Sequence, residues 1–302
     1  MKPSPVERES EFCKQLDADV HVKYEFFNPV KSFKIRGALN IAHALQLRND
    51  VKRVVTCSTG NHGSAMAYAC KEFGLPITIG VPEGCDQSKV ELIRQFEAEI
   101  EFIGRDLDET KEVMQEAGQA EGTVFVVDGS SPEVVAGTAT IGSELLEQLP
   151  ETEVFIVPVG NGALIGGVGA AIKSKRPDIR IVGVQAERAP CMALSFEAGQ
   201  PVNTEHCDTF ASGVAVRVAI PVAVDLVNAV VDDMLLVSEA EMKAAMANYH
   251  RNTGQLPEGA GAAALAAALR YRDQVAGKTI CLLATGANVD EGLRKEIIGN
   301  HG

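Results

Sequence analysis

The sequence lacks three features that each mark a class of protein. It has no excess of basic residues, because 28 Lys and Arg stand against 41 Asp and Glu, a net charge of −13 at pH 7. It has no apolar run of the roughly 18–20 residues that span a bilayer, and its first residues, MKPSPVERE, contain no apolar stretch of a secretory signal. We therefore expect no nucleic-acid partner, no membrane association and a cytoplasmic location.

The seven cysteines also form no recognisable framework. Their number is odd, they are widely spaced, and no C-x-x-C occurs. This argues against a set of disulfides or a structural zinc site, and for a reducing compartment. The 302 residues are 46% hydrophobic, which is ordinary for a soluble protein with a substantial core.

Short runs rich in β-branched residues alternate with segments of helical spacing along most of the chain. The predicted strands are Val20–Phe26, Arg53–Cys57, Pro76–Val81, Glu99–Ile103, Thr123–Val127, Val154–Val159, Arg180–Gln185, Val230–Val237 and Thr279–Ala284. The predicted helices are Ile35–Leu47, Asn61–Phe73, Ser88–Phe96, Asp106–Ala117, Pro132–Leu149, Ala163–Lys175, Glu239–His250, Ala260–Tyr271 and Glu291–Ile298, with a loop-rich region at 187–218. This alternation predicts an α/β fold with two open, mostly parallel twisted sheets that carry helices on both faces.

The segment Ser32–Gly37 (SFKIRG) places Lys34 at the start of a predicted helix, after a hydroxyl and an aromatic ring and close to an arginine. A free lysine is protonated at neutral pH and is then a poor nucleophile. A helix N-terminus, a nearby cation and an apolar wall all favour the neutral amine. Lys34 is therefore a candidate Schiff-base lysine, although a single lysine at a helix start is more often an ordinary solvated residue.

Three other motifs follow predicted strands. Ser58–Gly63 (STGNHG) opens a helix and would present free backbone N–H groups to an anion, such as a substrate carboxylate. Gly160–Gly167 (GNGALIGG) also lies between a strand and a helix, where glycines let the backbone approach a phosphate. Thr285–Asn288 (TGAN) offers a hydroxyl that suits a ring nitrogen. Each motif alone is compatible with a turn, a helix cap or tight packing.

The order of the four motifs resembles the fold type II pyridoxal-phosphate enzymes (tryptophan synthase beta-like), and within them the threonine dehydratase/serine racemase family. That family's S-F-K-x-R-G, S-x-G-N-H and S/T-G-x-N match Ser32–Gly37, Ser58–His62 and Thr285–Asn288, and its glycine-rich loop matches Gly160–Leu164 in part. The resemblance extends over nearly the whole chain.

The resemblance implies a cofactor, pyridoxal 5'-phosphate, and a role for each motif. Lys34 would hold it as a Schiff base and act as the base at Cα, and Phe33 would adjoin it. Asn61 would bind its 3'-oxygen, the loop of Gly160, Asn161, Gly162, Ala163 and Leu164 its phosphate, and Thr285 its pyridine nitrogen. Ser58, Thr59, Gly60 and His62 would line the substrate carboxylate site, with Thr59 as a second catalytic candidate. Residues 1–50 and 135–302 would form a large cofactor-binding domain and 51–134 a small mobile domain.

The sequence departs from the family pattern at several positions. Lys31 stands where the family has glycine, and its amine either binds an acidic substrate side chain or faces solvent. Asn161 and Ala163 interrupt the glycine run of this loop. Asparagine tolerates a positive φ, whereas Ala163 must keep φ negative. Gln185 and Cys191 replace the carboxylates of a divalent-metal site found in many relatives, so we expect no metal there. A metal site that uses Glu187 as its carboxylate ligand instead is a weaker alternative.

The function implied is β-elimination from a 3-hydroxy amino acid such as threonine or serine, giving a 2-oxo acid and ammonia. The chain ends shortly after Asp290, so we expect no C-terminal regulatory domain. A racemase, or a lyase for a modified 3-hydroxy or 2,3-diamino acid, remains open because Thr59 keeps a hydroxyl where serine racemases have serine. β-Replacement is less favoured because of His62. A non-catalytic cofactor-binding protein is also less favoured, because Lys34, Asn61 and Thr285 are intact. The family is commonly dimeric or tetrameric, so a homodimer or homotetramer is expected.

Overall fold

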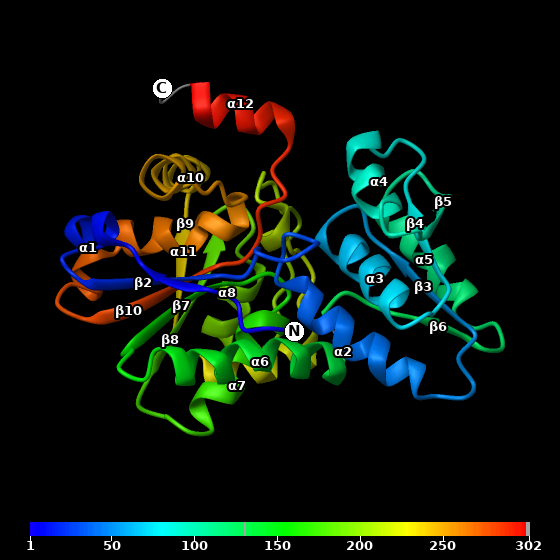
Figure 1. Cartoon of the computed structure of the whole chain (residues 1–302), viewed down its shortest axis with the longest axis horizontal. Coiled ribbons are helices and arrows are strands. Elements are labelled where there is room, and N and C mark those ends of the chain that lie inside the picture. The colour runs from blue at the N-terminus through cyan, green and yellow to red at the C-terminus, as the bar shows by residue number, and fades with distance from the viewer. Residues whose placement is uncertain (130, 300–302) are drawn as a thin grey trace. The chain divides into compact units, whose positions relative to one another are not determined.

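The computed structural model describes residues 1–129 and 131–299, and it divides into two compact units (Figure 1). We call Met1–Phe27 together with Thr138–Gly302 the large unit, and Asn28–Gly137 the small unit. Residues 28–50, which we assigned to the large domain from the sequence, lie in the small unit. The reason is that the helix they contain, α2 (Lys34–Gln46), packs along α3 (Asn61–Glu72). Mobility of the small domain stays a prediction.

The large unit is built on a six-stranded sheet in the order β1-β2-β10-β7-β8-β9. Only β1 is antiparallel to its neighbour, β2; every other pair is parallel. The strands are β1 (Val6–Arg8), β2 (Asp19–Tyr24), β7 (Val154–Pro158), β8 (Arg180–Ala186), β9 (Asp233–Val237) and β10 (Thr279–Ala284). The central strands β7 and β10 are almost wholly buried, as expected when both faces of a parallel sheet are covered.

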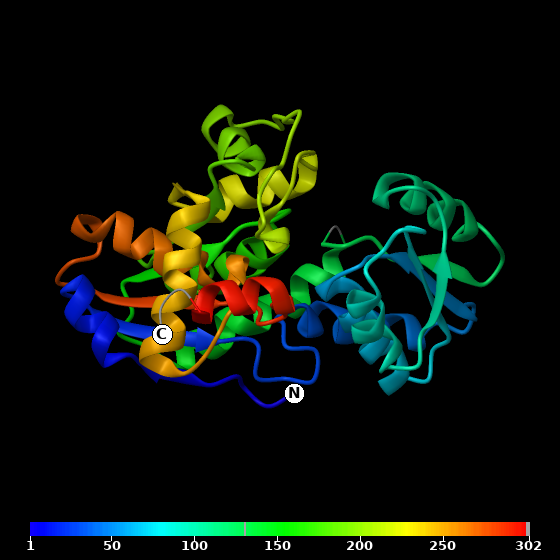
Figure 2. The same cartoon turned by 90° about the horizontal axis from the view of Figure 1, so that it is seen from above.

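Helices cover this sheet on both sides (Figures 1 and 2). The Ala- and Gly-rich α11 packs closely on β7, β8, β9 and β10, and α7 packs against β7 and α9 on the opposite side. The remaining helices of this unit are α1, α8, α10 and α12, and α6 crosses the boundary between the units. The helix bounds are α1 (Ser10–Leu16), α6 (Pro132–Gln148), α7 (Ala163–Lys173), α8 (Cys191–Ala198), α9 (Pro221–Val230), α10 (Glu239–Thr253), α11 (Gly259–Arg270) and α12 (Glu291–Gly299).

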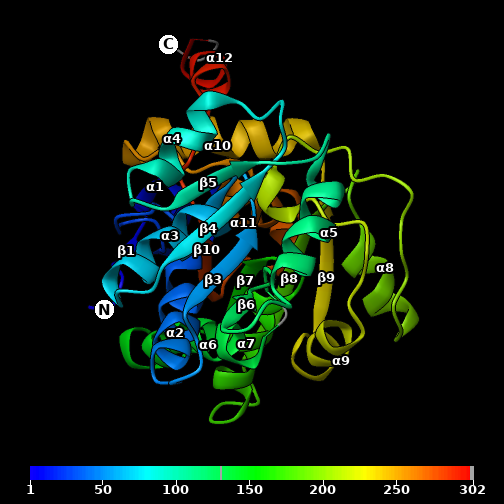
Figure 3. The same cartoon turned by 90° about the vertical axis from the view of Figure 1, so that its right-hand side faces the viewer.

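The small unit is built on a parallel four-stranded sheet in the order β5-β4-β3-β6. Figure 3 shows α5 on one side of these strands and α3 with α4 on the other. The strands are β3 (Arg53–Cys57), β4 (Ile77–Val81), β5 (Glu99–Phe102) and β6 (Thr123–Phe125), and the further helices are α4 (Gln87–Arg94) and α5 (Leu107–Ala117). The predicted pair of open, mostly parallel sheets is therefore confirmed.

Two parts of the sequence prediction were wrong or incomplete. We placed the start of a strand at Val230, but Val230 ends α9; the buried residues Ala223, Val224, Val227 and Val230 follow a helical spacing that the many valines masked. The region 187–218 was expected to be loop, yet it contains α8. The short elements β1 and α1 were not predicted.

A fully buried lysine joins the N-terminal segment to the rest of the large unit. Lys23 on β2 donates from Nζ to the Ser4 carbonyl oxygen at 3.0 Å, to Glu144 Oε2 at 2.6 Å and to Gln148 Oε1 at 2.7 Å. The carboxylate of Glu25, also fully buried, lies 4.0 Å from Nζ. The positive charge is thus satisfied by two carboxylates and two neutral acceptors, as a buried ammonium requires.

Candidate functional site in the two units

Two neighbouring strands of the small unit direct their following loops to one edge of the sheet. β3 and β6 are parallel and adjacent, pairing from Arg53 opposite Thr123 to Val55 opposite Phe125. Ligand sites in open α/β sheets gather beyond the carboxyl ends of strands. The loop after β3 carries Ser58–Gly63, and the segment after β6 carries Asp128.

Lys34 is the first residue of α2, as predicted. Its backbone N–H donates to Ser32 Oγ at 3.3 Å, and Nζ lies 5.4 Å from the ring centroid of Phe33, the N-cap residue. The side chain is 17% exposed, so it sits in a partly apolar place. Asn28 Oδ1 accepts the backbone N–H of Val30 and holds the turn that leads into this helix.

Lys31 precedes this helix with a backbone φ of 51°. A side chain in this left-handed region costs about 1–2 kcal/mol. The turn thus keeps the conformation that suits glycine, the residue the family has there. The Lys31 side chain is exposed.

The Lys34 amine has a carboxylate partner that sequence reasoning missed. Nζ donates to Asp128 Oδ1 at 2.5 Å, across 94 positions of the chain. Burial alone would raise the pKa of the Asp128 carboxyl, but the Lys34 charge, the interaction with His62 and the hydrogen bond from Lys34 hold it below its usual range. Asp128 is therefore ionised at neutral pH. The sequence did offer one indication of Asp128, because it is a polar residue directly after a predicted parallel strand.

His62 is buried beside this ion pair. Its Nε2 lies 3.1 Å from Thr56 Oγ1, and its Nδ1 lies 3.5 Å from Asp128 Oδ1. Burial lowers the pKa of the imidazole, and the Lys34 charge adds to that, while the Asp128 charge opposes it. We predicted His62 in the substrate carboxylate site; its side chain contacts Thr56 and Asp128, and that role stays a prediction.

The loop before α3 is shaped for an anion. Gly60 is the N-cap of α3, and no side chain caps this helix end. The Gly60 N–H donates to Ser58 Oγ at 3.2 Å, and a Cβ built on Gly60 would meet nothing within 4 Å, so the space over this turn is open. Gly63 must be glycine, because a Cβ there would lie 2.9 Å from the Ser58 carbonyl oxygen. Thr59 and Asn61 flank the cap, and Thr59 is half-buried.

The large unit has a second turn of the same kind, between β7 and α7. Gly162 is the N-cap of α7, with a φ of 96° and no side-chain cap. The Ala163 N–H donates to Asn161 Oδ1 at 3.3 Å. A Cβ on Gly160 would lie 2.6 Å from the Gly213 carbonyl oxygen. The backbone N–H groups at this helix start suit a phosphate.

The backbone conformation of this turn explains why the loop does not need glycine at every position. The left-handed conformation falls on Gly162, and Asn161 is not among the non-glycine residues with positive φ in the described chain. Ala163 is already helical, so its φ is negative as we predicted.

Thr285 follows β10, which lies beside β7 in the sheet. It is 3% exposed. The turn after it is fixed by Glu258, whose backbone N–H donates to the Gly286 carbonyl at 2.9 Å and whose Oε2 accepts the Asn288 N–H at 3.2 Å. Because β7 and β10 are parallel neighbours, Thr285 and the Gly160–Leu164 loop emerge at the same edge of the large unit's sheet.

The residues at the positions of the family's metal ligands make other contacts. Gln185 Oε1 accepts the Ala193 N–H at 2.8 Å, and Cys191 Sγ lies 3.3 Å from the Val202 carbonyl oxygen. Glu187, the alternative ligand, pairs with Arg270 at 2.5 Å. Residues 1–129 and 131–299 contain no cluster of three His, Cys, Asp or Glu side chains placed to hold a metal.

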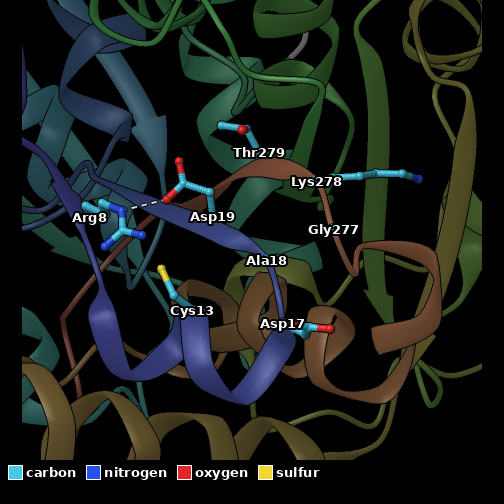
Figure 4. A pocket seen from close by; sticks show the side chains of 8 residues that line it. All are labelled: Arg8, Cys13, Asp17, Ala18, Asp19, Gly277, Lys278 and Thr279. Carbon is cyan, nitrogen blue, oxygen red and sulfur yellow. Dashed lines mark hydrogen bonds and ion pairs between the residues drawn. The ribbon is translucent and has the colours of Figure 1, made fainter.

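A hollow of about 500 Å³ lies at the other end of the large unit's strands (Figure 4). Its lining includes Asp19 and Thr279, the first residues of β2 and β10, and Arg8, which is paired with Asp19 at 2.6 Å. It contains none of the predicted site residues and lies at the amino ends of the strands. The carboxyl-end loops are therefore the better candidate.

Comparison with known proteins identifies the family of this chain. The family model described as pyridoxal-phosphate dependent enzyme matches residues 1–286. The chain belongs to this family. The predicted family, cofactor and fold type are thereby confirmed.

Relatives of this pyridoxal-phosphate-dependent protein extend over most of its length. The L-threonine ammonia-lyase of Thermotoga maritima is 38% identical over 281 residues, 93% of this chain and 70% of that protein. The structure of processed threonine deaminase isoform 2 from Solanum lycopersicum superposes with a TM-score of 0.95 at 30% identity, covering 99% of this chain and 88% of that one. Maize serine racemase gives 0.91 at 30% identity, covering 99% and 92%. In the described part of this family member, no helix is both long and apolar enough to cross a bilayer.

Proposed function

We propose that the protein is a pyridoxal-phosphate-dependent ammonia-lyase that converts a 3-hydroxy amino acid, such as threonine or serine, to a 2-oxo acid and ammonia. The observation that carries the proposal is the 38% identity, over 93% of the chain, to a protein called L-threonine ammonia-lyase. The proposal is strengthened by Lys34, an amine at a helix start beside an ionised carboxylate.

Each unit, taken by itself, carries groups that suit a part of the cofactor. The start of α7 offers backbone N–H groups to a phosphate, and Gly160 must be glycine there because a Cβ would collide with the Gly213 carbonyl oxygen. The Thr285 hydroxyl suits the ring nitrogen, the Asn61 amide the phenolic oxygen, and the Lys34 amine the aldehyde. Phe33, Asn161, Ala163 and Leu164 complete the proposed binding set. The uncapped start of α3, with Ser58, Thr59, Gly60 and His62, is proposed to receive the substrate carboxylate.

These residues favour elimination. The bound cofactor withdraws electrons from Cα of the amino acid, which makes the Cα proton acidic. Lys34 removes that proton. Thr285 is neutral and does not hold a proton on the ring nitrogen as a carboxylate would, so negative charge is poorly stabilised there. Prompt departure of a β-hydroxyl relieves this charge, whereas transamination would need it to persist.

The test is a substrate screen of the loaded protein. L-Threonine, L-serine, other 3-hydroxy amino acids and 2,3-diaminopropionate are each assayed for 2-oxo acid and for ammonia. We expect equal amounts of both from at least one 3-hydroxy amino acid. EDTA should leave the rate unchanged, because we propose no metal at Gln185 and Cys191. No 2-oxo acid from any 3-hydroxy substrate would refute the proposal.

A racemase is the second candidate, because Thr59 places a hydroxyl at the cap of α3 and because a serine racemase is among the similar structures. Thr59→Ala separates the two functions. A lyase should keep 2-oxo acid release within about tenfold, whereas a racemase should lose isomerisation of the amino acid, measured by chiral chromatography. Thr59→Ser is the matched control, because it keeps the hydroxyl and should keep either activity.

We further propose that the protein acts in the cytoplasm as a homodimer or homotetramer on a small amino-acid substrate. The support is the resemblance to its family, together with the absence of a bilayer-spanning helix among residues 1–129 and 131–299.

A further inference from the structure

Three titratable groups form a row inside the small unit: the Lys34 amine, the Asp128 carboxylate and the His62 imidazole. Asp128 Oδ1 is the common atom, 2.5 Å from Lys34 Nζ and 3.5 Å from His62 Nδ1. Lys34 is 17% exposed and His62 6%, whereas Asp128 is 40% exposed. The carboxylate thus joins two sheltered nitrogens to solvent.

The neighbours of His62 decide which of its nitrogens carries the proton. Thr56 Oγ1 donates its only proton to the Val126 carbonyl oxygen at 2.7 Å. The same oxygen, 3.1 Å from His62 Nε2, must then accept from an Nε2–H. In the neutral ring Nδ1 therefore has a lone pair, and it faces the Asp128 carboxylate.

Two acceptors that face each other make no hydrogen bond until a proton arrives. Burial keeps the pKa of His62 low, so the ring is neutral in the resting protein. A further titratable group near Asp128 is the thiol of Cys57. Burial raises its pKa to about 11, Lys111 opposes this rise and Asp128 and Asp108 support it, so the thiol is neutral as well. Asp128 therefore carries the negative charge of this row, and Lys34 Nζ is in contact with it.

We propose that Asp128, backed by His62, holds the Lys34 amine in place and stabilises the ammonium that forms when Lys34 takes the proton from Cα of the amino acid. This inference rests on the proposed function, in which Lys34 is the base. Asp128 touches the reacting nitrogen and is in this sense a catalytic residue, while His62 acts through it as a positioning residue.

The step balances in protons and electrons. Lys34 takes the Cα proton, the electrons of that C–H bond form the double bond between Cα and Cβ, and the hydroxyl leaves with the electrons of the C–O bond. The proton stays on Lys34 Nζ, whose N–H donates to Asp128 Oδ1. The leaving hydroxide takes this proton from Lys34 and becomes water, so Lys34 returns to the neutral amine while Asp128 stays ionised and His62 neutral.

The first test is Asp128→Asn, which keeps the size of the side chain and removes its charge. Loss of the charge that stabilises the Lys34 ammonium is expected to lower kcat by about 10²–10³-fold, with KM changed little. Asp50→Asn is the matched control: Asp50 is an exposed carboxylate of the same unit that pairs with Arg48, and this variant should keep the wild-type kcat. Asp128→Glu should restore part of the activity.

A second readout does not depend on turnover. In the cofactor-free protein, the pKa of His62 is followed by ¹⁵N NMR of its ring. Asp128→Asn should lower it further, because the Asp128 charge is what favours the imidazolium; Asp50→Asn should leave it unchanged. In the loaded protein, Asp128→Gly should regain turnover with added formate, since the 40% exposure of Asp128 leaves access for a small carboxylate.

The outcomes separate this inference from the function it rests on. Absence of lyase turnover in the wild-type protein would refute the function. An active wild type together with an Asp128→Asn variant of equal kcat would overturn the inference alone. An inactive Asp128→Asn with an unshifted His62 and no rescue by formate or by Asp128→Glu would also overturn it. So would failure of the variant to load the cofactor, measured by absorbance, because Asp128 would then be a binding residue.

Discussion

Replacing Lys34 with alanine is expected to abolish turnover, lowering kcat on the best 3-hydroxy amino acid by about 10⁴-fold or more, the upper end of what one general base contributes. The size of the effect follows from two losses at once, the amine that holds the cofactor and the base at Cα. Turnover is measured as 2-oxo acid release at saturating substrate.

Covalent labelling gives the same prediction a chemical readout. Borohydride treatment of the loaded wild type should fix the cofactor to the peptide that contains Lys34, and the Lys34→Ala protein should remain unlabelled. Lys71→Ala is the control, because Lys71 is a lysine of the same unit that pairs with Glu97 at the surface. A Lys34→Ala variant that is still labelled on another lysine, or that still turns over at the wild-type rate, would show that the base is elsewhere.

The largest expected effect on stability comes from Lys23, not from the catalytic residues. Lys23→Met keeps the volume of the side chain but leaves the carboxylates of Glu25 and Glu144 without their buried cation. Breaking a buried ion pair from one side costs about 3–5 kcal/mol. The free energy of unfolding should fall by that amount, measured by urea titration with far-UV circular dichroism.

Two controls isolate the charge. Lys14→Met removes a lysine that is 72% exposed and pairs with Glu11, and it should change the free energy of unfolding by less than about 1 kcal/mol. Lys23→Met combined with Glu144→Gln should cost less than the sum of the two single changes, because the second change removes the carboxylate charge that Lys23 had neutralised. Equal losses for Lys23→Met and Lys14→Met would mean that the buried cluster contributes no more than a surface pair.

The sequence predicted the main features of the fold because most elements agree with their local signals. β3 and β10 have the predicted bounds, and Lys34, Gly60 and Gly162 lie at helix starts as the motifs indicated. α9 was misread because valines favour strands, and only the spacing of its buried residues identifies a helix.

Asp128 could not be predicted to bind Lys34 from the sequence alone. The two residues are 94 positions apart, and their contact exists only because β6 pairs with β3 and brings the end of β6 near the start of α2. The tautomer of His62 likewise depends on Thr56 and Val126, which no local motif connects. Residue types were readable from the sequence, whereas their partners required the tertiary structure.

The place of β10 in the large unit's sheet has a consequence for how the chain folds as it is synthesised. β10 lies between β2 and β7, so the middle of the sheet is filled by the last of the described strands to leave the ribosome. The small unit is one continuous segment, Asn28–Gly137, with all four of its strands made early. Domains fold as units during synthesis, N-terminal first. The small unit is therefore free to fold while β1 and β2, made before it, must wait for β10 to complete their sheet.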